Sequence, residues 1–157
     1  MRFAALALCL FLPAAALAEE APVLAEYWAR SGSLPPQYAW STEVTIRTDG
    51  QLLLKHCTGY ETEGPACTQA KARVKPARLD AITAAARASG LAEKPAAEAD
   101  RPPIGGGTVA GRVTLDGTAI ALPAFPAKPD QDRVAAVLAS ISQAIPHRLM
   151  RSNFDGD

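Results

Sequence analysis

Several residue types on which functional sites commonly depend are scarce in this sequence. It contains two histidines and three cysteines among 157 residues, and aromatic residues make up 6% of the chain. No serine lies in a glycine-flanked nucleophile turn, and no two histidines have the helical spacing of a zinc site. These absences weaken a catalytic interpretation without excluding one, and the sequence indicates no metal and no cofactor.

An excess of charge of one sign is missing too. Sixteen basic residues balance sixteen acidic residues, whereas a dedicated nucleic-acid-binding protein usually carries a strongly basic balance. We therefore expect no nucleic-acid partner.

Long apolar runs are absent except at the beginning of the chain. Arg2 precedes an apolar run over residues 3–17, and the Ala16-Leu17-Ala18 sequence has the small first and third residues of a cleavage site. Two glutamates follow at once, so the run is too short and wrongly flanked for a membrane span. The sequence predicts a signal peptide over residues 1–18, cleaved after Ala18. The mature protein would be periplasmic or secreted and would have no transmembrane segment.

The mature chain would keep two cysteines, Cys57 and Cys67, ten residues apart. An oxidising compartment favours a disulfide between them, and two cysteines without a second pair make a poor zinc site. Removing 18 of 157 residues leaves 139, the size of one domain. We assign residues 19–145 to a single domain and residues 146–157 to a disordered tail.

Two alternating runs flank the loop 48–50, whose Thr-Asp-Gly sequence suits a three-residue hairpin connection. A two-residue turn would place Lys55 opposite Val44 and mix charge into the apolar face. The three-residue loop instead gives one face the pairs Ile46 with Leu52, Val44 with Leu54, and Thr42 with His56.

The next segments continue the pattern of strands followed by a helix. Residues 68–74 alternate basic and small side chains and predict a third strand. Pro76 begins an alanine-rich helix over residues 76–89, and Gly90 suits its C-terminal cap. The segment 92–103 has no periodicity and predicts a long surface loop, which is either functional or loosely ordered.

A second hairpin is predicted around Asp116-Gly117, with Val113 opposite Ile120. Apolar residues at helical spacing from Val134 to Ile145, with Asp130 as N-cap, predict a second long helix. Residues 21–30 predict a short N-terminal helix. The expected fold is α+β: an antiparallel sheet of about five strands built from two hairpins, each followed by a helix on one face (β-β-β-α-β-β-α).

Two features could carry chemistry but have simpler explanations. The register turns His56 toward the apolar face, where a half-buried, hydrogen-bonded imidazole is the favoured interpretation over a catalytic one. The glycine triplet 105–107 could collect an anion through its backbone donors. It leads into a strand rather than a helix, however, which favours a flexible start to that strand.

Two surfaces are candidates for binding. Lys71, Arg73, Lys75 and Arg78 form the densest group of basic residues and could dock an acidic partner or an anionic envelope surface, although such alternation also protects an edge strand from unwanted pairing. The loop between the cysteines contains Tyr60 and Glu61, and a loop held at both ends presents contact residues at a low ordering cost.

The sequence alone leaves the biochemical function open. We expect an exported, noncatalytic domain that binds or supports a protein or cell-envelope partner through the cysteine-bounded loop or the basic strand. A small periplasmic hydrolase that uses His56 is one alternative, and a passive structural protein of the envelope is another. Nothing in the sequence indicates the oligomeric state.

Overall fold

A computed structural model describes residues 20–60, 66–103 and 105–151 of the chain. The predicted signal peptide, Glu61 and the last six residues lie outside the described residues. The described elements are, in order, β1 Val23–Arg30, η1 Pro36–Tyr38, β2 Trp40–Arg47, β3 Gln51–Thr58, β4 Ala66–Arg73, α1 Pro76–Ser89, β5 Thr108–Leu115, β6 Thr118–Leu122, η3 Lys128–Asp130, α2 Gln131–Ala144 and α3 His147–Arg151.

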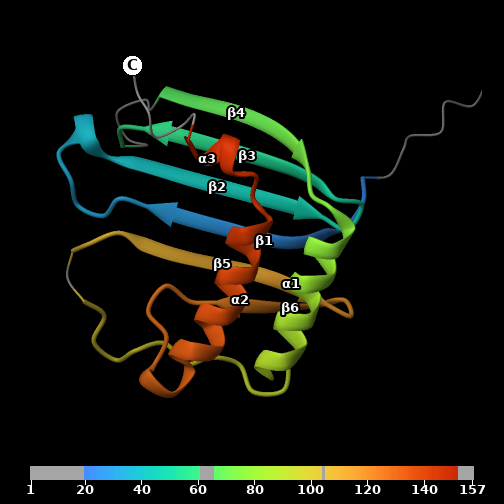
Figure 1. The fold of residues 1–157 in the computed structure, drawn as a ribbon. Coiled ribbons are helices and arrows are strands. Elements are labelled where there is room, and N and C mark those ends of the chain that lie inside the picture. Colours follow the sequence, from blue (N-terminus) through green and yellow to red (C-terminus); the bar gives the residue numbers. More distant parts are fainter. Residues whose placement is uncertain (1–19, 61–65, 104, 152–157) are drawn as a thin grey trace, which may run out of the picture.

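The strands form one antiparallel sheet in the order β4-β3-β2-β1-β5-β6, so the fold is α+β as predicted. Helices α1 and α2 pack side by side across one face of this sheet (Figure 1). We call the opposite surface the open face, because the helices that the structure describes all lie on the other side. Strand β4 is one edge of the sheet and β6 is the other.

Both predicted hairpins are confirmed, including their registers. Strands β2 and β3 pair Ile46 with Leu52 and Val44 with Leu54, and Gly50 closes the loop with φ of 84°. Strands β5 and β6 pair Val113 with Ile120. Asp116 and Gly117 both have positive φ, as a two-residue type I′ turn requires.

The predicted N-terminal helix is wrong, because residues 23–30 form strand β1 in the middle of the sheet. Alternate residues Ala25, Tyr27 and Ala29 are buried against the helices. The strand pairs antiparallel with β2 on one side and with β5 on the other. It joins the two hairpin units into one sheet and raises the strand number from about five to six.

The core lies between the inner face of the sheet and the two long helices. Apolar side chains from both layers are almost completely buried there: Ile46, Leu52, Leu54, Ile82, Leu91, Val113, Leu122, Val134, Val137 and Ile141. The start of α1 at Pro76 and its left-handed cap at Gly90 are as predicted. A short helix, α3, occupies part of the predicted tail, and Leu149 packs against the core.

Asp130 precedes α2 as predicted, but its side chain does not cap the helix. The carboxylate accepts hydrogen bonds from the Ala97 amide at 2.9 Å and from Arg133 at 2.5 Å. Arg133 also donates to the carbonyl oxygens of Ser89 and Lys94. This network holds part of the 92–103 loop between the end of α1 and the start of α2.

Candidate functional site

Side chains that point away from the helices alternate along each strand and make up the open face. The register aligns them in rows across the sheet. One row runs Lys71, Leu53, Thr45, Glu26 and Arg112, from β4 to β5. Arg112 is ion-paired with Glu26, whereas Leu53 leaves 39% of its surface exposed.

The cysteines lie on this face in directly opposed positions of β3 and β4. Their Sγ atoms are 2.12 Å apart, which is a disulfide distance. The bond joins the edge strand to its neighbour close to the point where β3 ends. It also fixes the base of the loop between the two cysteines. Tyr60 of this loop is among the residues that the structure describes.

Lys71 and Arg73 lie on the open face with Arg47 of β2. Together with Glu20, Thr45, Gln51 and Leu53 they line a groove of about 440 Å³, which we call the basic groove. Glu20 is the one carboxylate among its described lining residues, and it is ion-paired with Arg47. Lys71 and Arg73 are exposed and make no ion pair with any described residue.

The other two residues of the predicted basic group are elsewhere. Lys75 is the N-cap of α1 and Arg78 lies in the first turn of that helix. Both are exposed, and neither is among the residues that line the basic groove. The structure therefore separates the group of four into two pairs, one on the open face and one at the beginning of α1.

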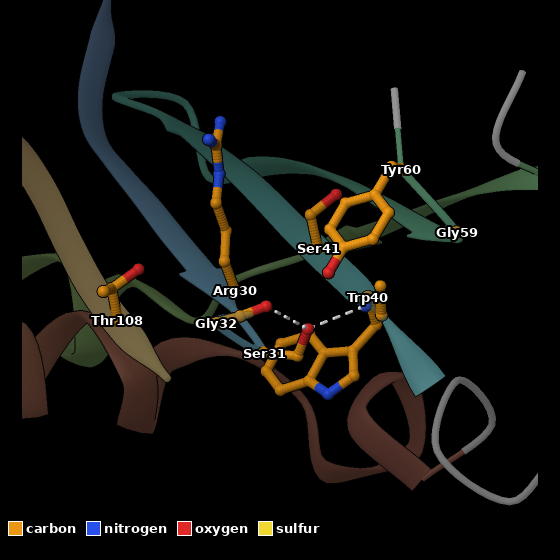
Figure 2. Close-up of a pocket in the computed structure, with 9 residues that line it drawn as sticks. Arg30, Ser31, Gly32, Trp40, Ser41, Gly59, Tyr60 and Thr108 are labelled. Carbon is orange, nitrogen blue, oxygen red and sulfur yellow. Dashed lines mark hydrogen bonds between the residues drawn. The ribbon is translucent and has the colours of Figure 1, made fainter. Parts of the chain in front are cut away.

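A second hollow, the strand-end pocket, lies where β1 and β3 end and β2 and β5 begin (Figure 2). Its volume is about 390 Å³, and its lining residues are Arg30, Ser31, Gly32, Ala39, Trp40, Ser41, Gly59, Tyr60 and Thr108. Arg30 and Ser41 extend to the same side, with the ring of Tyr60 beside Ser41, while Trp40 turns the other way.

Backbone contacts hold the pocket walls in place. The Ser31 hydroxyl accepts the Trp40 amide at 3.0 Å, and Gly59 donates its amide to the Ala39 carbonyl at 2.8 Å. The Tyr60 hydroxyl donates to the carbonyl oxygen of Leu34. The sequence identifies Tyr60 as a candidate contact residue but gives no signal for Arg30, because the apolar spacing of residues 21–30 predicts a helix.

The glycine triplet lies beside this pocket. Gly106 approaches the turn at Gly32 so closely that a Cβ atom on Gly32 would lie 2.0 Å from the Gly106 carbonyl oxygen. A Cβ on Gly107 would lie 3.0 Å from the carbonyl oxygen of Arg30. At Gly32 and Gly107 the absence of a side chain therefore allows close backbone packing at the start of β5.

His56 faces the helix side and is only 5% exposed. Its Nδ1 atom lies 2.8 Å from the hydroxyl oxygen of Thr42, and the ring of Trp40 stacks on it with centroids 6.2 Å apart. Burial lowers the pKa of the imidazole. This is the buried, hydrogen-bonded histidine that the register favoured, and it is poorly placed to reach a substrate.

The part of the chain that the structure describes contains no group of three or more side chains able to hold a metal ion. Within the same residues, every helix is too short or too polar to cross a membrane. No protein-family model matches the sequence. A comparison with curated proteins finds no match either.

Proposed function

We propose that this protein is exported and acts as a noncatalytic binding domain, which holds an acidic segment of a partner protein on the open face of its sheet. The basic groove is the observation that carries the proposal. Lys71 and Arg73 lie there with Arg47, and Glu20 is the single carboxylate among the described lining residues. Such a groove attracts a negatively charged partner.

Exposed Leu53 favours a protein segment over a simple anion. It lies opposite Lys71 of β4 on one side and Thr45 of β2 on the other. An acidic segment with an apolar residue would therefore contact Leu53 while its carboxylates approach the flanking cations. The balanced charge of the whole chain argues against a nucleic acid as the occupant.

Export rests on the apolar leader and on the disulfide, which an oxidising compartment maintains. Intact-mass measurement of the native protein tests this part of the proposal. We expect a mass that corresponds to cleavage after Ala18 with two hydrogens lost to the disulfide. A protein that retains Met1 or two free thiols would contradict export.

The geometry does not support the alternative of a hydrolase that uses His56, because this side chain is buried and its ring stacks against that of Trp40. A general acid or base must come within hydrogen-bonding distance of its substrate. The strand-end pocket is lined by Trp40 but not by His56.

Binding of a fluorescent twelve-residue oligoglutamate peptide tests the basic groove. In the double variant Lys71→Glu/Arg73→Glu, we expect the affinity to fall at least roughly tenfold, about 1.4 kcal/mol. The matched control Lys75→Glu/Arg78→Glu makes the same change in net charge at the start of α1. Because those residues lie outside the groove, the control should bind nearly as well as the wild type.

Two results would overturn the proposed site. One is an equal loss of affinity in both double variants, which would show a response to net charge alone. The other is the absence of measurable binding by the wild-type protein at low salt, where attraction between exposed charges is strongest.

A further inference from the structure

We propose that the strand-end pocket is a second binding site, which takes the carboxylate of an organic acid or of a peptide C-terminus on the guanidinium of Arg30. This inference goes beyond the proposed function, because it uses none of the residues of the basic groove. On β2 the nearest lining residues of the pocket and of the groove are Ser41 and Thr45, which lie about 13 Å apart at the usual rise of a strand.

The register places three polar side chains side by side at this end of the sheet. Arg30, the last residue of β1, is paired with Ser41 of β2 and with Thr108 of β5. Directly opposed residues of antiparallel strands have Cβ atoms about 5 Å apart. The Arg30 side chain therefore starts between two hydroxyl-bearing residues that come from different strands.

These groups are available to a ligand. Within the described part of the chain, Arg30 makes no ion pair, and the hydroxyls of Ser41 and Thr108 make no hydrogen bond to protein atoms. The lining residues that the structure describes include no carboxylate that would compete for the guanidinium. A planar guanidinium binds a carboxylate through two parallel hydrogen bonds, and a hydroxyl can donate a third.

The surroundings of Arg30 indicate the rest of the ligand. Trp28 lies two residues before Arg30 on the same face, and a shallow hollow of about 300 Å³ joins Trp28 and Arg30 to Thr108. Tyr60 forms the wall on the other side of the pocket. Aromatic surfaces near a cation favour an acid with an apolar or aromatic group close to its carboxylate.

The site is also held in shape before any ligand binds. The hydrogen bonds of Ser31 to Trp40 and of Gly59 to Ala39 fix two of its walls. The close contact of Gly32 with Gly106 fixes a third. A site that is already ordered loses little conformational entropy on binding.

Calorimetric titration with matched acids and amides tests the site. The probes are 3-phenylpropionate against 3-phenylpropionamide, and a tetrapeptide ending in phenylalanine with a free or an amidated C-terminus. We expect each carboxylate to bind at least roughly tenfold more tightly than its amide. If the small acid binds as tightly as the peptide, the source is a free organic acid; tighter binding of the peptide identifies a protein C-terminus.

Substitutions of Arg30 test whether the carboxylate binds at this residue. Arg30→Gln should abolish the preference for the acids, and Arg30→Lys should retain part of it. Arg112→Gln is the matched control, since Arg112 lies on the same face but is ion-paired with Glu26. Thermal unfolding of each variant would verify that it is folded.

Equal affinity for acid and amide would overturn this inference, as would an Arg30→Gln protein that binds like the Arg112→Gln protein. The Lys71→Glu/Arg73→Glu variant should bind the acids like the wild type. The two proposals can therefore fail separately.

Discussion

His56 gives the stability of the protein a dependence on pH. Burial disfavours the imidazolium and lowers the pKa of the folded state below the ordinary value of 6.5. The unfolded chain then binds more protons than the folded chain at acidic pH. The free energy of unfolding should therefore decrease as the pH falls below about 6.5, by at most about 1.4 kcal/mol per pH unit.

Urea unfolding between pH 7.5 and pH 5 measures this effect. A His56→Gln variant should be less stable at neutral pH, because it loses packing against Trp40, but its stability should change less with pH. His147→Gln is the control, because His147 is exposed in α3. If the free energy of unfolding of His56→Gln changes with pH as steeply as that of the wild type, another titratable group causes the pH dependence.

Gly32 and Gly105 both have positive φ, but only Gly32 has a close backbone neighbour. Alanine substitutions at the two positions therefore distinguish the energetic cost of backbone strain from that of a steric clash. Gly32 has φ of 79°, and its added Cβ would overlap the Gly106 carbonyl. Gly105 has φ of 80°, and no heavy atom lies within 4 Å of its added Cβ. Gly105→Ala should destabilise the protein by about 1–2 kcal/mol.

Gly32→Ala should cost clearly more, because the backbone must also move. Chemical denaturation of both variants, with the wild type as reference, measures the difference. Equal destabilisation would show that Gly32 and Gly106 are not in close contact in solution.

The disulfide acts on the edge strand β4, which has one neighbour in the sheet. Its cysteines are separated by 10 residues. Closing a loop of that length lowers the conformational entropy of the unfolded chain, which raises the free energy of unfolding by roughly 2–3 kcal/mol. The Cys57→Ala/Cys67→Ala variant should lose about this amount in a urea titration, with faster amide hydrogen exchange in β4 than in β6. Unchanged stability would show that the disulfide gives the folded state no net stabilisation relative to the unfolded chain.

Asp130 connects α2 to the long loop, and its neighbours hold the pKa of its carboxyl below the usual range, chiefly through Arg133 and the Ala97 amide. Asp130→Asn should lower the melting temperature and speed hydrogen exchange at Ala97. Asp132→Asn removes an exposed charge from the first turn of the same helix and should change neither quantity. If both variants behave alike, the effect comes from the helix dipole rather than from the network.

Local patterns were sufficient to predict the hairpins and α1. The turn residues at 48–50 and at Asp116-Gly117 fix the registers of the two hairpins, and Gly90 marks the C-terminal end of α1. Strand β1 was missed because Leu24 and Trp28 also fit a helical spacing over so short a segment. Its identity depends on pairing with β5, which begins 78 residues after β1 ends at Arg30. The same long-range pairing brings Arg30 to Ser41 and Thr108, so the strand-end pocket was not predictable from local sequence.

At the scale of the whole molecule, two long helices pack on one face of a six-stranded sheet (Figure 1). The other face carries exposed Arg30, Lys71 and Arg73. The fold places the basic groove toward one end of that face and the strand-end pocket toward the other. The disulfide joins Cys57 of β3 to Cys67 of β4.

Backbone amide chemical shifts, recorded while the full mature protein is titrated with the oligoglutamate peptide at low salt, test the central claim most directly. We predict that the largest changes fall on alternate residues of three adjacent strands, around Thr45, Leu53 and Lys71, and that they disappear as salt is added. Changes centred on Lys75 and Arg78 at the start of α1, or no saturable change anywhere, would contradict a binding site on the open face.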